Sequence, residues 1–364
     1  MRIQTFLNGA PAAVLLAACG SSASNPPSPP SDPVRDMIFA AVEEDGTVAA
    51  LDGKTGALVK TIDLSVASMG TMTKYDVHNV QAAPDGKTAW VTAMPSMPAD
   101  AGPSMPMPDE LVGIDTSSLA ITKRISLGEN QHPAHVVLDG TTAYVTAFDA
   151  NALLVVDVAA GKLTKSVPLP ANTKPHGLRM TPDHKTLVLA GMGAGTIVLV
   201  DVASLAITAI PLPAPAVQAA VLPDGSAAFV SIFRTMQVAR LDLATRAVTL
   251  FDLPKGSVGP LQVYPTPDSK HVWVADQGNL EGRPAGNHIY RLNAATGATD
   301  LTVNVGSAPH GLVVNAQGTR LWATIVEDGT VDEIDATSGK VLVTTPVGTK
   351  PNGITCVHDD AAMP

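Results

Sequence analysis

Cysteines, aromatic residues and charged residues are all scarce in this chain of 364 residues. It has two cysteines, Cys19 and Cys356, and Phe, Trp and Tyr make up 4% of the sequence. Stability must therefore come from apolar packing rather than from a disulfide framework. Charged residues are 15% of the chain, with 23 Lys and Arg against 33 Asp and Glu. No basic stripe is present to neutralise phosphates, so we expect no nucleic-acid partner.

The N-terminal segment differs in composition from the rest of the chain. Residues 1–18 combine Arg2 with an apolar run and small residues, a pattern typical of an export signal, and the run is too short to span a membrane. The next segment, "SSASNPPSPPSDPVRD", is rich in Ser and Pro and cannot bury a core. We predict a signal peptide over residues 1–18, a tether over 19–36, a folded domain over 37–358 and a tail over 359–364.

The run from Leu16 to Cys19, "LAAC", resembles the lipobox of bacterial lipoproteins. The resemblance implies that Cys19 is acylated and anchors the mature chain. Gly20, rather than Asp, after the cysteine implies retention in the outer membrane. The expected location is therefore the cell envelope, facing the periplasm or the cell surface, with the lipid as the only membrane attachment.

An internal repeat organises the remainder of the chain. "TKPHGLRMTPDHKTLVLAG", from Thr173 to Gly191, returns in related form as "SAPHGLVVNAQGTRLWATI", from Ser307 to Ile325. Alignment on the histidine gives seven register residues, spaced 41 to 57 residues apart: His78, His135, His176, Gln218, Gln262, His310 and Asn352. A second marker, an acidic or amide residue after an apolar run, keeps the same period: Asp52, Asp115, Asp157, Asp201, Asp242, Asn293 and Asp335.

Periods near 40 with several short β-rich runs predict an all-β propeller with one four-stranded antiparallel blade per repeat. Seven registers predict seven blades. Residues 37–64 supply only three strands before the first full repeat, so we expect "PNGITCVHD", near the C-terminus, to pair beside them and close the ring. The second set of markers is expected to close hairpin turns by bonding their own backbone.

The stretches "AYVTAFDANALLVVD" and "AWVTA", with the PHG-to-PDG spacing, resemble the YVTN family of seven-bladed propeller repeat proteins over residues 37–358. The resemblance implies the fold rather than one chemistry, because the family and its relatives include binding proteins, lyases and lactonases. The PHG openings are also similar to those of streptogramin lyases, which use a propeller-centre histidine with a divalent metal. The chain lacks the aromatic-rich strands of that group.

The register residues are expected at the start of the innermost strands, where they would ring the mouth of the central channel. Four of the nine histidines share this register, and imidazoles suit zinc, copper, nickel or ferrous iron better than calcium or magnesium. One alternative stays open: each histidine could bond only the backbone of a neighbouring blade. The predicted metal ligands are His78, His135, His176 and His310, and the predicted ligand-binding rim is Gln218, Gln262, Asn352 and His288.

Two long insertions fall between second and third strands, on the same face. "DQGNLEGRPAGNH" carries Asp276, Glu281 and His288. The other, "AMPSMPADAGPSMPMPDE", resembles copper-handling segments, because thioethers favour Cu(I). Copper is thus preferred over zinc or another divalent metal, although an ordinary Met-rich loop is the alternative. The weaker candidate ligands are Met94, Met97, Met105, Met107 and His132.

Three functions follow from these patterns. The leading hypothesis is a lipid-anchored, monomeric propeller that binds copper, or a small ligand, at the channel mouth. The second is a metal-assisted lyase or hydrolase with His176 or His310 as acid or base. The third is a scaffold that binds a protein partner through its rim, without chemistry.

Overall fold

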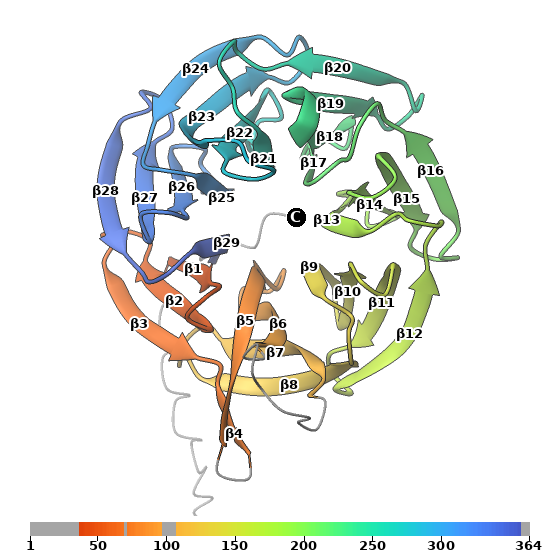
Figure 1. Cartoon of the computed structure of the whole chain (residues 1–364), viewed down its shortest axis with the longest axis vertical. Helices are drawn as coiled ribbons and strands as arrows, with labels where there is room; N and C mark the ends of the chain where they lie inside the picture. Colours follow the sequence, from red (N-terminus) through yellow and green to blue (C-terminus); the bar gives the residue numbers. More distant parts are fainter. Residues whose placement is uncertain (1–35, 69–70, 97–106, 358–364) are drawn as a thin grey trace, which may run out of the picture. The chain divides into compact units, whose positions relative to one another are not determined.

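The computed structural model describes residues 36–68, 71–96 and 107–357. Their strands form seven separate antiparallel sheets around a central channel, which confirms the predicted seven-bladed β-propeller (Figure 1). The one helical element in these ranges is a short 3-10 turn, η1 (Phe233–Thr235). Across the same residues, no helix has the length and apolar character needed to cross a membrane.

The first three complete blades carry the first three histidines of the repeat. Blade 1 consists of β5 (Thr71–Ala82), β6 (Thr88–Ser96), β7 (Asp109–Asp115) and β8 (Ile121–Gly128). Blade 2 consists of β9 (Pro133–Asp139), β10 (Thr142–Ala147), β11 (Ala152–Asp157) and β12 (Lys162–Pro168). Blade 3 consists of β13 (Pro175–Met180), β14 (Thr186–Gly191), β15 (Thr196–Asp201) and β16 (Ile207–Pro211).

The next three blades complete most of the ring. Blade 4 consists of β17 (Ala219–Val221), β18 (Ala227–Ile232), β19 (Gln237–Asp242) and β20 (Val248–Asp252). Blade 5 consists of β21 (Pro260–Pro265), β22 (His271–Gly278), β23 (Ala285–Asn293) and β24 (Thr299–Asn304). Blade 6 consists of β25 (Pro309–Val314), β26 (Arg320–Ile325), β27 (Thr330–Asp335) and β28 (Val341–Pro346).

Blade 7 joins the two ends of the described chain, as the out-of-phase start of the sequence predicts. Its strand order is β29 (Pro351–Val357), β1 (Met37–Val42), β2 (Thr47–Asp52) and β3 (Leu58–Asp63). Met37 pairs with Val357 and Ala40 with Ile354. The innermost strand thus comes from the C-terminal end, and the other three come from the N-terminal end. One addition was not expected: β4 (Val66–Ser68) pairs with the start of β5 and adds a fifth strand to blade 1.

The apolar patterns of the strands follow their distance from the channel. Innermost β13 is buried throughout, whereas outermost β28 alternates between half-buried and exposed residues because one face meets solvent. The core lies between neighbouring blades: Phe39 of β1 and Val91 of β6 belong to one buried cluster, and Leu153 of β11 and Leu187 of β14 to another.

The second set of sequence markers closes the hairpin turns, as predicted. Asp115 Oδ1 accepts hydrogen bonds from the Ser118 main-chain N–H at 2.8 Å and from the Ser118 hydroxyl at 2.7 Å. Asp335 makes the equivalent pair with Ser338, at 2.8 Å and 2.9 Å. These carboxylates satisfy turn backbone and are structural.

Candidate metal centre at the channel mouth

The register residues occupy irregular positions in the innermost strands. Six of them lie within β5, β9, β13, β21, β25 and β29, and Gln218 directly precedes β17. At His78 the pairing of β5 with β6 shifts register between Val77 and Asn79, and at His176 the pairing of β13 with β14 shifts between Pro175 and Leu178. Such bulges turn a side chain away from the regular pleat.

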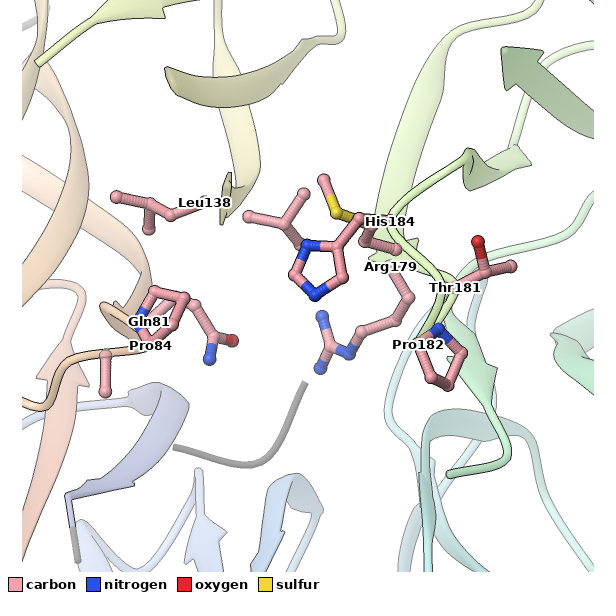
Figure 2. Close-up of a pocket in the computed structure, with 10 residues that line it drawn as sticks. Gln81, Pro84, Leu138, Arg179, Thr181, Pro182 and His184 are labelled. Atoms are coloured by element: carbon pink, nitrogen blue, oxygen red, sulfur yellow. The ribbon is translucent and has the colours of Figure 1, made fainter. Parts of the chain in front are cut away.

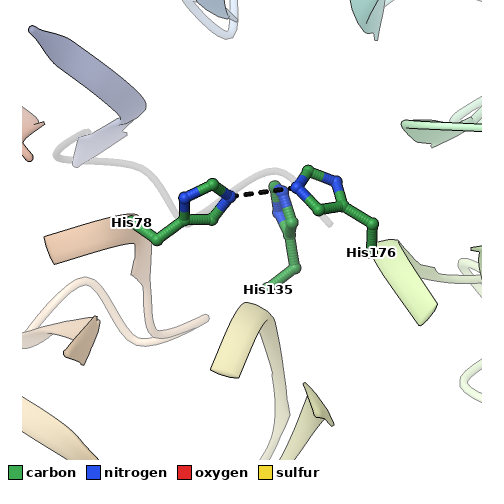
Figure 3. A group of neighbouring side chains, drawn as sticks. All are labelled: His78, His135 and His176. Carbon is green, nitrogen blue, oxygen red and sulfur yellow. Dashed lines mark hydrogen bonds between the residues drawn. The ribbon is translucent and has the colours of Figure 1, made fainter. Parts of the chain in front are cut away.

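Three of the four register histidines meet (Figure 3). One ring nitrogen from each of His78, His135 and His176 lies within 4.8 Å of the others. The Nε2 atoms of His78 and His176 are 3.0 Å apart, and the His135 ring centroid is 5.9 Å from that of His78 and 5.1 Å from that of His176. The three belong to consecutive blades. This group of imidazoles could hold a metal ion.

His78 is oriented by a carboxylate. Its Nδ1 lies 3.3 Å from Glu43 Oε1, in the turn between β1 and β2. Asn352 Nδ2 donates to Glu43 Oε2 at 2.8 Å, so two register residues share this carboxylate. A carboxylate that accepts the second N–H of an imidazole fixes its tautomer and leaves the other nitrogen as a ligand.

His176 is oriented by the backbone of the next blade. Its Nδ1 donates to the carbonyl oxygen of Val217 at 3.1 Å, which leaves Nε2 facing His78. This contact matches the structural alternative in which each histidine bonds a neighbouring blade. The two roles are compatible, because a backbone carbonyl is a common partner for the distal nitrogen of a metal-binding imidazole.

His135 and Gln218 form a buried pair that lacks partners on two atoms. Gln218 Nε2 lies 2.7 Å from His135 Nε2. His135 is 3% exposed and Gln218 is fully buried, yet His135 Nδ1 and Gln218 Oε1 have no hydrogen-bond partner. Unpartnered buried polar atoms are costly and indicate either a functional role or a missing ligand.

The threonines of the second strands bind adjacent blades together beneath the histidines. Thr146 of β10 accepts a hydrogen bond from the His135 main-chain N–H at 3.0 Å and donates to the His176 carbonyl oxygen at 2.7 Å. Thr324 makes the same bridge between Gly311 and Asn352, at 2.7 Å on each side. One hydroxyl therefore positions two histidine backbones at once.

The electrostatics favour neutral imidazoles beside one ionised carboxylate. Burial lowers the pKa of His135 and of His176 well below the usual range, and neighbouring histidine charge lowers both further. Burial and the charge of His78 lower the pKa of His310 to about 4. Burial alone would raise the pKa of Glu43, but His78 and Asn352 outweigh it and bring it to about 2. At neutral pH the lone pairs of His135, His176 and His310 are thus available.

The remaining predicted ligands lie apart from the three-histidine group. His310 contacts Gln277, whose Oε1 is 2.5 Å from its Nδ1, and His288 stacks on Tyr290 with centroids 5.8 Å apart. His132 is turned toward Asp149, 3.2 Å from its Nδ1, rather than toward His135. Gln262 is buried on β21.

The two insertions lie where the sequence predicts, between second and third strands. Met94, near the end of β6, is paired with Asp76 of β5, and Met107 lies just before β7. Met97 and Met105 lie outside the described residues. In the second insertion, Asp276 accepts main-chain N–H bonds from Val258 and Gly259, and Glu281 pairs with Arg234.

The predicted metal ligands are all histidines and methionines, and the structure adds a carboxylate, Glu43, beside His78. A signal was present: in a blade whose innermost strand is β29, the turn between β1 and β2 is a second-to-third-strand turn, on the same face as the histidines. That turn, "EEDG", carries two adjacent glutamates, Glu43 and Glu44. Which of them reaches a histidine depends on tertiary packing.

No known family model matches the sequence, and no curated protein matches it. Solved structures match the fold. Periplasmic gluconolactonase from Pseudomonas aeruginosa is 17% identical, with a TM-score of 0.68, over 89% of this chain and 99% of its own. Virginiamycin B lyase from Staphylococcus aureus, a catalytically inactive variant with quinupristin, is 15% identical, with a TM-score of 0.63, over 82% and 96%. Hydrazine synthase from Kuenenia stuttgartiensis is 17% identical, with a TM-score of 0.62, over 79% and 92%. At these identities the likeness establishes the propeller fold.

Proposed function

We propose that His78, His135 and His176 bind one divalent transition-metal ion at the channel mouth. The observation that carries this proposal is the 3.0 Å separation of the His78 and His176 Nε2 atoms, whose rings both direct Nδ1 to acceptors, Glu43 and Val217. Two lone pairs at that distance repel unless a cation lies between them. Imidazole nitrogens bound at about 2.0–2.1 Å to one zinc ion are separated by roughly 3 Å.

His135 supports a third ligand bond. Asn and Gln amides are oriented by their hydrogen bonds, and turning the Gln218 amide lets Oε1 accept the Nε2–H of His135. His135 Nδ1 then presents a lone pair. In that orientation Gln218 Oε1 gains a partner and a metal ion would occupy His135 Nδ1, while the amide nitrogen takes the position that Oε1 held.

Three neutral imidazoles are typical ligands of Zn²⁺ and Cu²⁺, and three protein ligands leave a further position for water or substrate. Thioether ligation, which favours Cu(I), would have to come from methionines outside the three-histidine group, such as those of the first insertion. We therefore extend the copper hypothesis to two candidates, Cu²⁺ and Zn²⁺. Metal analysis of protein purified without a histidine tag is the direct test.

We expect about one equivalent of copper or zinc per chain after such a purification, or after reconstitution with either ion. The competing arrangement is a hydrogen bond between the two imidazoles: His78 Nε2–H would donate to His176 Nε2, with His78 Nδ1 accepting from Asn352 Nδ2 at 3.3 Å. A protein that binds neither ion after reconstitution would establish that arrangement and remove the metal centre.

Glu43→Gln should weaken metal binding about 10- to 100-fold, the usual effect of removing the carboxylate partner of a metal-bound histidine. Glu44→Gln is the matched control, because Glu44 is in the same turn but pairs with Lys350. Calorimetric titration of Zn²⁺ into both variants measures the two affinities, which we expect to differ. Equal affinities would show that Glu43 does not support the centre.

A second candidate function is metal-assisted hydrolysis or elimination. The observation that favours it is His310, a buried register histidine outside the metal group whose low pKa, about 4, keeps its imidazole neutral at pH 7. A gluconolactonase and a virginiamycin B lyase are among the structures that share the fold, which makes lactones and cyclic esters the first substrates to assay. His310→Gln in metal-loaded protein should abolish any such turnover without releasing the metal. Absence of turnover in the wild type would favour binding alone, or a scaffold for a protein partner.

On the sequence resemblances we further propose that this YVTN-type propeller is exported as a monomer. In this proposal Cys19 anchors it to the cell envelope through lipid, at the outer membrane. Cys19 and the tether lie outside the described residues. An anchored propeller would present its channel mouth to metal ions or small ligands of the periplasm or the cell surface.

A further inference from the structure

A second set of side chains lines a cavity farther along the same three innermost strands. Three positions after the register residues stand Gln81 on β5, Leu138 on β9 and Arg179 on β13, and all three line a cavity of about 280 Å³ (Figure 2). Three residues of strand span roughly 10 Å, so this cavity is separate from the histidine group.

Arg179 is buried, and the described part of the chain supplies it with no counter-ion. Arg179 is 8% exposed, and its Nη1 donates a hydrogen bond to the carbonyl oxygen of Leu178 at 2.8 Å. No carboxylate of the described residues lies within ion-pair distance of it. Arginine is almost never fully buried unless it is paired, because desolvating a charge is costly. Among the described residues, the guanidinium therefore lacks the partner that its burial calls for.

The repeat does not require a charged residue here. The residues at the same offset in the other six blades are Gln81, Leu138, Val221, Pro265, Val313 and Thr355, none of them charged. Arg179 is thus a departure from the repeat at a position where valine and glutamine fit the same fold. Its presence is explained better by a ligand than by packing.

The walls of the cavity define that ligand. The His184 ring, held by Asp139 Oδ1 at 3.1 Å from its Nδ1, lies at the cavity with Gln81 and the Arg179 guanidinium (Figure 2). Val137 and Leu138 supply an apolar side. The guanidinium fork matches a carboxylate in two parallel hydrogen bonds.

We propose that this cavity binds a small organic carboxylate, with its carboxylate on Arg179 and its apolar part against Val137 and Leu138. A single buried guanidinium balances one negative charge, which favours a carboxylate over a phosphate dianion. The half-exposed His184 gives the ligand a route from solvent. The cavity shares no lining residue with the three-histidine group, although, besides burial, the charge of Arg179 lowers the pKa of His135.

The test uses hexanoate and its neutral analogue hexanamide, titrated calorimetrically into the full chain and into Arg179→Gln, which carries the residue that blade 1 has at this offset. We expect the wild type to bind hexanoate at least about tenfold more tightly than hexanamide, and the variant to lose that preference. The His78→Gln/His176→Gln variant should bind hexanoate like the wild type, which separates this site from the metal centre.

Thermal melting without ligand gives a second readout. Removing an unpaired buried charge should raise the Tm of Arg179→Gln and of Arg179→Val by about 2–4 °C, whereas a structural arginine would stabilise the fold and its loss would lower the Tm. Equal binding of hexanoate and hexanamide, or no binding of either, would overturn the proposal, as would a lowered Tm in both variants. Tighter binding of inorganic phosphate than of hexanoate would overturn the assignment to carboxylates.

Discussion

Replacing His78 and His176 together with glutamine should lower the affinity for Cu²⁺ or Zn²⁺ by roughly 1000-fold or more, because one imidazole cannot supply the geometry of a three-ligand site. Glutamine is suited to this position, since Gln218 and Gln262 occupy the same register in blades 4 and 5. Competition titration against a chelator measures the loss, and melting of the metal-free proteins verifies that both remain folded.

His132→Gln combined with His288→Gln is the matched control. The sequence made His132 a weaker metal candidate and His288 part of the ligand-binding rim, and the structure places them beside Asp149 and Tyr290, outside the three-histidine group. The affinity of the control for metal should be within about threefold of the wild-type affinity, because the three proposed ligand histidines are unchanged. If both double variants lose affinity equally, the metal is held by a broader set of side chains. If neither does, the register histidines are a structural repeat.

Ending the chain at Lys350 should abolish cooperative folding. The truncation removes β29, which pairs with β1 and is buried along its whole length. The truncation removes three buried apolar side chains, those of Ile354, Cys356 and Val357. Burial of each contributes about 1.5–3 kcal/mol to the free energy of unfolding, and their sum approaches the total stability of a typical domain. The loss also exposes the edge of β1 to other chains.

Calorimetry and circular dichroism of the truncated chain measure this effect, and a chain that lacks only residues 359–364 is the control because it retains β29. We expect the control to melt as one transition and the longer truncation to aggregate or melt broadly. A truncated protein with the melting curve of the full chain would contradict closure of the ring by β29.

Much of the fold could be predicted because a propeller is built from local patterns repeated at a fixed period. The seven register residues predicted seven blades. The three strands supplied by residues 37–64 left a fourth to be found, which placed "PNGITCV" beside β1. The turn carboxylates, such as Asp115, bond backbone two or three residues away. Interactions of such short range are visible in the order of residues.

The site depended on contacts between blades that no local pattern encodes. The repeat alone determined that four histidines share one position in the fold. The bulges in β5 and β13, together with closure of the propeller ring, bring His78, His135 and His176 together. His310 instead contacts Gln277. Glu43 and Arg179 acquire their roles from strands 35 or more residues away. Side-chain direction in a curved, bulged strand follows from packing against neighbouring blades, and only the closed tertiary structure brings those neighbours together.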